Sequence, residues 1–384
     1  MNITIISHKE IWFDKKSDTG FATTGGFPFQ ISAISELFDS TRLVALQRKK
    51  TIQGDLTNIY GKNIIVRSLP EPLGKGIFRK LYLIIWLPLH IKTLWNEITH
   101  ADIIHAAIPG DLGLIGMILS LLKRKRLFIR HCGTWGNTRT LTDRFINWLL
   151  PLIAKDNTLV LATGGGDSLP CSKNSNIKWI FSTTLKQQAW YNIIQPRPWN
   201  EKKTLRLVSV GRLSKDKNTI ALIKALRLIK NDVPDIHLDI IGEGPEMKKM
   251  VQLAYDYDLI NLITFHGNLS NSKVIKFLSK SDIFLFPTKT KEGFPKVLVE
   301  AMACGLPIIA SRVSVIPYLI EDRCGIVLGD SRIDSIVDAV LTMISRPDKM
   351  EEMGKESRLI SKNYTLENWQ ARIKTLLNDS VFNI

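Results

Sequence analysis

The chain has 384 residues, a length that suits two domains of roughly 180 residues each better than one core. Hydrophobic residues make up 45% and charged residues 23%, which excludes disordered, collagen-like and coiled-coil chains. The net charge of +16 is uneven, with +12 in residues 1–200 and +4 in residues 201–384. Nucleic acid, an anionic lipid surface or a phosphorylated substrate would each fit this basic first half, and composition does not choose among them.

Cysteine usage and the apolar runs indicate where the protein works. Neither a disulfide framework nor a zinc cluster is expected, because no C-x-x-C pair occurs among Cys132, Cys171, Cys304 and Cys324. The first residues, MNITIIS, indicate a buried strand and not a signal peptide. The longest uncharged apolar runs have 10 or 11 residues, short of the roughly 20 that cross a bilayer. We therefore expect a cytoplasmic protein without a membrane-spanning helix.

Short β-rich runs alternate with helical stretches through the first half of the chain. The strands are expected at residues 2–7, 42–47, 63–68, 102–107, 127–130, 158–162 and 177–181. Strict alternation of strand and helix is typical of a doubly wound α/β domain with a parallel sheet. The sequence therefore predicts one Rossmann-like domain over residues 1–186.

The stretch 187–200 breaks this pattern and contains QPRPW, which predicts a linker between domains. A second Rossmann-like domain is expected over residues 201–362. Its strands are continuous apolar runs, as parallel strands covered on both faces require, at 205–211, 236–242, 261–267, 282–288, 306–311 and 325–328. A last helix within 363–384 is expected to pack back on the first domain, and the two domains are expected to face a central cleft.

The most informative stretch is TKEGFPKVLVEAMACGLPIIAS at residues 290–311. A loop with Glu292 precedes a helix expected from about Pro295, since proline is tolerated in the first helical turn. The positive end of that helix would point at the strand ends, where an open α/β sheet binds its ligand. Glu300 follows on the second turn, roughly 7 to 8 Å further along the helix. The two carboxylates would then bind different hydroxyl-rich parts of one ligand.

A basic motif, GRLSKDK, directly follows the first strand of the second domain. Its Arg212 can chelate phosphate oxygens, and its Lys217 adds a point charge. Together they could neutralise a diphosphate without a metal. The D-x-D pattern Asp256 to Asp258, a spacing that metal-dependent sugar transferases use, is expected at a helix end and not at a strand end. No metal site is therefore expected.

These stretches resemble the nucleotide-sugar domain of retaining glycosyltransferases of family 4, the glycosyltransferase group 1 enzymes, which have the GT-B fold. The resemblance rests on GRLSKDK, on IGEGP at residues 241–245 and on the Glu-x7-Glu spacing of Glu292 and Glu300. It implies that Glu292 contacts the donor sugar and that Glu300 holds the ribose. It also implies that the diphosphate binds to the side chains of Arg212 and Lys217 and to the backbone amides of Gly293 and Phe294.

The first half resembles the same family more loosely. Gly25 and Gly26, in TTGGFPFQ, are similar to the glycine-rich loop that approaches the donor phosphates after the first strand. His131, in FIRHCGTW, matches the family histidine near the transferred sugar, and His105 matches another at a strand end. The sequence differs from the family pattern in two loops of the second domain. Asn218 replaces the usual glycine after the lysine, and residues 314–318 (SVIPY) replace a Gly-Gly-x-Pro-Glu run.

The sequence thus favours a retaining hexosyltransferase-type enzyme that uses a nucleoside diphosphate sugar, a UDP-sugar by preference, with no metal and no cofactor. Glu292 and His131 are its candidate catalytic residues. The expected acceptor is a lipid-linked or cell-envelope glycan, as in bacterial polysaccharide, lipopolysaccharide or capsule biosynthesis. A nucleotide-sugar epimerase or hydrolase on the same fold is one alternative, and a nucleic-acid-binding protein is another, although nucleic acid is not the expected partner.

Residues 75–92 (KGIFRKLYLIIWLPLHIK) leave two interpretations open. They could be a core helix beside a solvated charge run. They could also be a peripheral docking patch on the inner face of the membrane. In that case the lipid phosphates would contact Lys75, Arg79 and Lys80, and the acyl boundary would contact Phe78, Tyr82 and Trp86.

Overall fold

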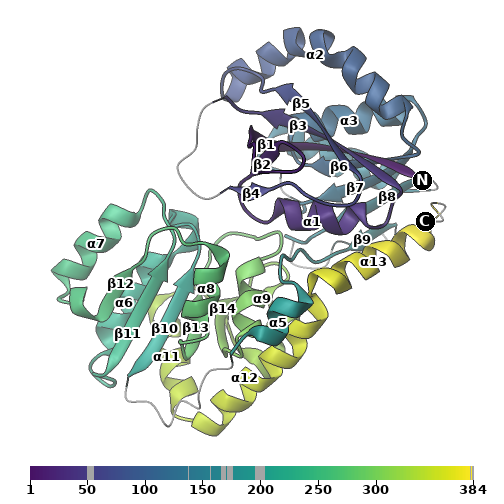
Figure 1. The fold of residues 1–384 in the computed structure, drawn as a ribbon. Coiled ribbons are helices and arrows are strands. Elements are labelled where there is room, and N and C mark those ends of the chain that lie inside the picture. Colours follow the sequence, from purple (N-terminus) through teal and green to yellow (C-terminus); the bar gives the residue numbers. More distant parts are fainter. Residues whose placement is uncertain are drawn as a thin grey trace. The chain divides into compact units, whose positions relative to one another are not determined.

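The computed structural model describes residues 1–49, 56–136, 138–155, 157–165, 170, 176–194, 204–380 and 382. The chain divides into two compact units, which Figure 1 shows in ribbon form. The N-terminal unit comprises Met1–Gly164, Leu169–Thr184 and Leu366–Ile384. The C-terminal unit comprises Gly165–Ser168 and Leu185–Thr365.

The N-terminal unit is built on a parallel sheet whose described strands follow the order β5, β3, β1, β6, β7, β8, β9. Their bounds are β1 (Asn2–Phe13), β3 (Ser40–Gln47), β5 (Ile64–Pro70), β6 (Ile103–Ile108), β7 (Arg126–His131), β8 (Thr158–Ala162) and β9 (Ile177–Trp179). Each strand expected in this half is confirmed. Two short antiparallel strands that the sequence did not predict, β2 (Phe21–Thr23) and β4 (Thr57–Asn58), continue the sheet beyond β1.

Helices cover both faces of this sheet (Figure 1). One face carries α1 (Phe27–Ser35), and the C-terminal helix α13 (Leu366–Asn378) packs against α1. Gln370 of α13 donates a 2.7 Å hydrogen bond to the carbonyl of Ala33. The other face carries α2 (Gly76–Thr99), α3 (Asp111–Leu122) and α4 (Leu141–Ile153), which share one apolar core cluster. The last helix of the chain is thus part of the N-terminal unit.

The C-terminal unit holds a parallel sheet with the described strand order β12, β11, β10, β13, β14, β15. The strands are β10 (Leu205–Val210), β11 (Ile236–Ile241), β12 (Ile263–Phe265), β13 (Ile283–Phe286), β14 (Ile308–Ser311) and β15 (Gly325–Leu328). Their helices are α6 (Thr219–Ile229), α7 (Met247–Asp256), α8 (Asn271–Leu278), α9 (Lys296–Ala303), α10 (Ile316–Cys324), α11 (Ile333–Ile344) and α12 (Pro347–Ser361). Both units are doubly wound α/β structures, as predicted.

The expected linker is partly helical. Residues Gln187–Asn192 form α5, which the proline-based prediction did not include. Trp190 of α5 donates a 2.9 Å hydrogen bond to Ser361 of α12, and the guanidinium of Arg358 lies 4.1 Å from its ring centroid. These contacts attach α5 to the C-terminal unit. The proline-containing part of the expected linker, residues 195–200, lies outside the described residues.

The winding of the C-terminal sheet indicates where a ligand would bind. The chain runs from β10 outward to β11 and β12, then returns to the other side of β10 to form β13, β14 and β15. The strand order therefore reverses between β10 and β13. Doubly wound sheets bind ligands beyond the carboxyl ends of the strands at such a switch point.

Among the described helices of both units, none combines the length and apolarity that crossing a bilayer requires.

Candidate active site

Two loops meet at the switch point of the C-terminal sheet. One follows β10 and includes the short helical turn η3 (Lys215–Lys217), and the other follows β13. The backbone N–H of Lys289 donates a 2.8 Å hydrogen bond to the carbonyl of Asp216, and the Thr288 hydroxyl donates to the same oxygen at 3.4 Å. These bonds hold the basic motif beside the loop of the first glutamate.

The structure brings Lys217 and Glu292 into direct contact. The Lys217 ammonium donates to Oε1 of Glu292, and the Thr288 hydroxyl donates to the same oxygen at 3.2 Å. The side chains of Lys217 and Glu292 are 16% and 18% exposed, so each remains accessible to a ligand. The sequence assigned the two residues to different parts of a ligand and did not foresee this ion pair. A diphosphate that binds Lys217 would compete with Glu292 for the ammonium.

Glu300 lies on α9 and has a partner of its own. It is 9% exposed, and its Oε1 accepts a 2.9 Å hydrogen bond from the amide of Asn271, the first residue of α8. The two glutamates thus have different partners, in line with the separate roles inferred for them. Asn271 was missed because nothing in the local sequence of α8 distinguishes it from a solvated helix start.

The N-terminus of α9 differs slightly from the prediction. Pro295 has φ −81° and ψ 91°, an extended conformation, and the helix begins at Lys296. Proline therefore occupies the N-cap position and not the first turn, because its fixed φ is compatible with both. In this described segment no side chain caps the helix through a hydrogen bond. Its positive end thus lies next to the loop that carries Glu292, Gly293 and Phe294, where it favours a phosphate.

The two departures from the family pattern retain the backbone that glycine would allow. Asn218 has φ 56° and ψ 23°, in the left-handed region that asparagine adopts more readily than most residues. Ser314 has φ 53°, also left-handed. Each side chain supports a neighbouring loop, since Asn218 donates to the carbonyl of Ser331 at 3.1 Å and Ser314 to that of Glu292 at 2.5 Å. The loop shape is therefore compatible with both replacements.

Other predicted residues of the C-terminal unit do not touch this cluster. Arg212 is exposed on the loop after β10. The acidic pattern Asp256 to Asp258 lies at the C-terminal end of α7. Because α7 follows β11 and runs back along the sheet, that end lies at the edge opposite the switch point. Over the described parts of the chain, no group of three or more His, Cys, Asp and Glu side chains is placed to hold a metal ion.

The glycine pair of the N-terminal unit lies between β2 and α1. The sequence placed this loop directly after the first strand, but β1 extends to Phe13 and β2 intervenes, because a tight antiparallel pairing extends β1. Gly25 has φ 74°, and Gly26 is the N-cap residue of α1. A Cβ atom on Gly26 would lie 2.0 Å from Cγ2 of Thr184. Gly26 is therefore required for close packing at that point.

The two histidines have different surroundings. His131 ends β7, is 5% exposed, and packs edge-to-face against Trp135 at 5.3 Å. Burial lowers the pKa of His131 to about 4, so its imidazole is neutral at neutral pH. His105 lies within β6, fully buried and stacked 4.3 Å from the Phe128 ring. Its expected place at a strand end is wrong, because β6 continues to Ile108, and burial lowers its pKa to about 3.

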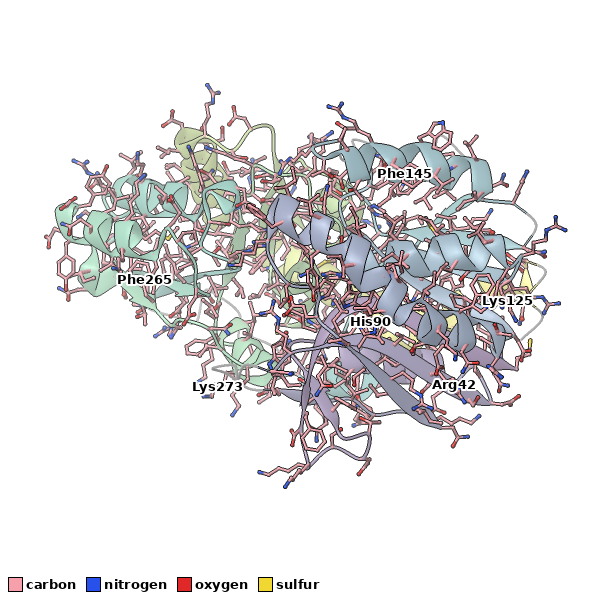
Figure 2. The ribbon with its side chains drawn as sticks, turned by 90° about the horizontal axis from the view of Figure 1, so that it is seen from above. Arg42, His90, Lys125, Phe145, Phe265 and Lys273 are labelled. Atoms are coloured by element: carbon pink, nitrogen blue, oxygen red, sulfur yellow. The ribbon has the colours of Figure 1, made fainter. Side chains whose placement is uncertain are left out.

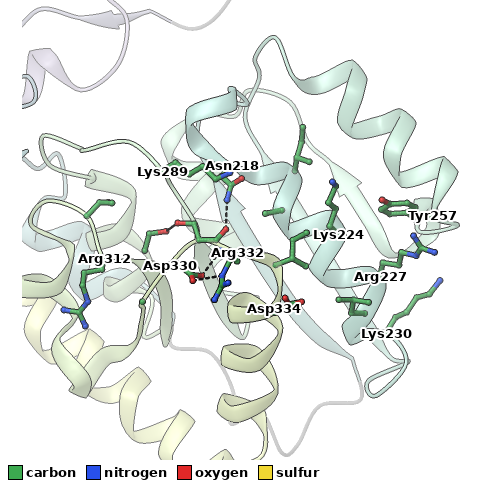
Figure 3. A pocket seen from close by; sticks show the side chains of 18 of the residues that line it. Asn218, Lys224, Arg227, Lys230, Tyr257, Lys289, Arg312, Asp330, Arg332 and Asp334 are labelled. Carbon is green, nitrogen blue, oxygen red and sulfur yellow. Dashed lines mark hydrogen bonds and ion pairs between the residues drawn. The ribbon is translucent and has the colours of Figure 1, made fainter. Parts of the chain in front are cut away.

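A groove of about 1290 Å³ lies beside the predicted site, along α6 and the start of α11 (Figure 3). Its lining shares Asn218 and Lys289 with the loops at the switch point. Two of its basic side chains already have partners, since Arg332 bonds to Asp330 at 2.6 Å and the Arg227 guanidinium lies 4.4 Å from the Tyr257 ring. The switch point is therefore the better candidate for nucleotide binding.

Comparison with known proteins finds a family match for the second half of the chain. Residues 192–360 match the family described as Glycosyl transferases group 1. The match covers most of the C-terminal unit and less than half of the chain. A GDP-mannose-dependent alpha-(1-6)-phosphatidylinositol monomannoside mannosyltransferase of Mycolicibacterium smegmatis is 29% identical over 175 residues, 44% of this chain and 45% of the relative. The amylovoran biosynthesis glycosyltransferase AmsK of Erwinia amylovora is 34% identical over 139 residues, 33% of this chain and 34% of the relative. The chain thus aligns with less than half the length of these relatives.

Similarity to solved structures extends over the whole chain. The Anabaena HepE structure in complex with UDP and glucose covers 99% of this chain and 100% of its own, with a TM-score of 0.71 and 15% identity. The lipopolysaccharide outer core galactosyltransferase WaaB in its apo form covers 99% of both chains, with a TM-score of 0.70 and 16% identity. The chain therefore has the GT-B fold, as the sequence predicted.

Proposed function

We propose that this protein is a retaining glycosyltransferase that moves a hexose from a UDP-sugar to a lipid-linked or cell-envelope glycan, without a metal ion or a cofactor. We place it in the cytoplasm, at the inner face of the membrane. The group 1 match over residues 192–360 supports the reaction class. The names of relatives that act on a phosphatidylinositol mannoside and in amylovoran biosynthesis support the acceptor class, and the HepE complex supports UDP.

One observation carries the proposal: basic, acidic and helix-end groups converge at the switch point between β10 and β13. As the glycosidic bond stretches, the leaving diphosphate gains negative charge. Arg212, Lys217 and the positive end of α9 would stabilise that charge more in the transition state than in the ground state. As Lys217 turned to the diphosphate it would release Glu292, whose carboxylate would then accept hydrogen bonds from the transferred sugar.

The remaining assignments follow from the family resemblance. Gly293 and Phe294 would offer backbone amides to the diphosphate, and Gly25 and Gly26 would let the backbone approach it. His131 would contact the transferred sugar as a neutral imidazole, because burial lowers its pKa to about 4. A neutral ring can donate one hydrogen bond to a sugar hydroxyl without placing a second positive charge near the anomeric carbon.

The first test concerns donor and metal. We expect UDP-glucose to raise the Tm of the protein in excess EDTA, because a ligand that binds only the native state stabilises it. UDP release with a bacterial envelope lipid extract as acceptor should also continue in EDTA. GDP-mannose and ADP-glucose are the donors with which UDP-glucose is compared. Turnover that stops on chelation and returns with manganese would contradict charge neutralisation by Arg212 and Lys217.

A second test concerns Glu300. We expect Glu300→Ala to raise KM for the donor about 10- to 100-fold with little change in kcat, since a carboxylate that holds the ribose binds ground and transition states equally. Asn271→Ala, which removes its 2.9 Å partner, should reproduce a smaller part of the effect. Glu351→Ala, at an exposed acid on α12, is the control. A fall in kcat at unchanged KM for Glu300→Ala would assign Glu300 to the transferred sugar instead.

A further inference from the structure

Large apolar side chains are exposed along two helices of the N-terminal unit. On α2 each of six is at least 57% exposed, namely Ile77, Phe78, Leu81, Ile84, Ile85 and Leu89. On α4 the exposed fractions are 77% for Leu141, 39% for Phe145, 61% for Trp148 and 55% for Leu152. Isolated exposed apolar residues are ordinary, but a contiguous group of them marks an interaction surface.

The spacing shows that each helix is apolar on both sides. The exposed residues of α4 recur at positions i, i+4, i+7 and i+11, so they form one stripe. Ile146 and Leu150, on the opposite side of α4, are buried in the core of the unit. On α2, the side chains of Trp86 and Leu94 are buried in the same core. Packing against the sheet thus uses one face of each helix and leaves a second apolar face outside.

These outer faces belong to one surface. Helices α2, α3 and α4 pack on the same core cluster and thus on the same face of the sheet. Figure 2 shows this layer from outside, with His90 labelled on α2 and Phe145 on α4. Between them α3 adds Leu122, which is 70% exposed. We call the outer faces of these three helices the α2–α4 surface.

The exposed charges on the α2–α4 surface are basic, whereas Asp143 in the first turn of α4 is half-buried and caps that helix. The exposed basic residues on these helices or within two residues of their ends include Lys75, Lys80, Lys92, Arg124, Arg144 and Lys155. The acids of α2 and α3 are already paired. Glu97 is 3% exposed and bonds to Arg42 and Arg67, and Asp111 bonds to Arg79 at 2.8 Å. An apolar face with basic residues around it complements an anionic bilayer, whose phosphates contact the basic groups while apolar side chains enter the acyl boundary.

We propose that the α2–α4 surface binds the protein to an anionic phospholipid bilayer, with α4 inserting alongside α2. The inference deepens the proposed function and rests on it, since a lipid-linked acceptor is presented at such a bilayer. It also corrects the docking patch that was one of the two interpretations of residues 75–92. Trp86 is 2% exposed and donates to the carbonyl of Pro70, and Arg79 is held by Glu71 and Asp111, so these two residues face inward.

Binding to vesicles tests both helices separately. We expect the full-length protein to bind phosphatidylglycerol vesicles and to bind phosphatidylcholine vesicles much less, with weakening between 0.1 M and 1 M salt. Ile84→Ser with Ile85→Ser should lower the partition coefficient about tenfold or more, and Trp148→Ser with Leu152→Ser should do the same, because each pair removes substantial apolar burial. Brominated phosphatidylglycerol should quench less of the total tryptophan fluorescence once Trp148 is replaced by phenylalanine.

Matched controls come from exposed apolar residues of the C-terminal unit. Tyr255 and Leu359 are each 61% exposed, as Trp148 is, and Tyr255→Ser with Leu359→Ser should leave vesicle binding unchanged. Equal binding by the α4 variant and the unsubstituted protein would overturn the inference. So would a dimer that dissociates in this variant without any vesicle binding. Vesicle binding needs no donor, so a protein that binds vesicles but does not bind UDP would leave this surface intact and refute the proposed function.

Discussion

Replacement of Glu292 by alanine is expected to lower kcat about 10²-fold or more, the range for a positioned electrostatic group, while UDP binds at least as tightly as before. The fall in kcat follows from the place of Glu292 beside the transferred sugar, where positive charge develops at the anomeric carbon. The retained UDP affinity follows from the ion pair, because Lys217 no longer has to leave a carboxylate to meet the diphosphate.

Kinetics with UDP-glucose and isothermal titration with UDP separate these two effects. Glu292→Gln keeps an oxygen that can accept the hydrogen bond from Thr288 but loses the charge, so it should show most of the kcat loss. Glu351→Ala, at an exposed acid on α12, is a control in the same unit. Weaker UDP binding by Glu292→Ala at unchanged kcat would reverse the proposed orientation of the donor.

Replacement of Lys217 by methionine is expected to lower kcat/KM about 10³-fold, because the ammonium serves both donor binding and the charge of the leaving diphosphate. Methionine keeps much of the length of the lysine side chain. The Lys217 ammonium lies 5.6 Å from the centroid of the Phe286 ring.

Lys215 provides the control for this variant, because it lies in the same turn η3 and is exposed. Lys215→Met should retain kcat/KM within about twofold, since exposed charges contribute little. Lys217→Arg should recover part of the activity, because it restores charge with a different reach. Equal losses in the two methionine variants would show a general effect of net charge and not a specific contact with the diphosphate.

Continuous apolar runs made the main strands predictable. All the strands expected in chain order are present, because parallel strands buried on both faces leave a strong signal. The missed strands β2 and β4 contain 3 and 2 residues, too few for a pattern. The order of the strands is also absent from local sequence, so the switch point between β10 and β13 emerged only in the structure.

The candidate site was predictable as a set of residues but not as a set of contacts. Lys217 and Glu292 were both selected, yet they are far apart in sequence, and their ion pair depends on β10 lying next to β13. Similarly, the two apolar sides of α2 gave no indication of which side packs on the sheet. One of the two interpretations therefore placed Trp86 at a membrane although it belongs to the core, and the outward face of α4 was missed.

The most direct test of the nucleotide site is a crystal structure of the protein with UDP bound. We expect the diphosphate to lie between Arg212 and Lys217 at the N-terminus of α9, with the ribose hydroxyls on Glu300 and the Lys217–Glu292 ion pair broken. UDP bound instead in the groove along α6, with Arg227 and Arg332 as its contacts and the ion pair intact, would contradict a donor site at the β10–β13 switch point.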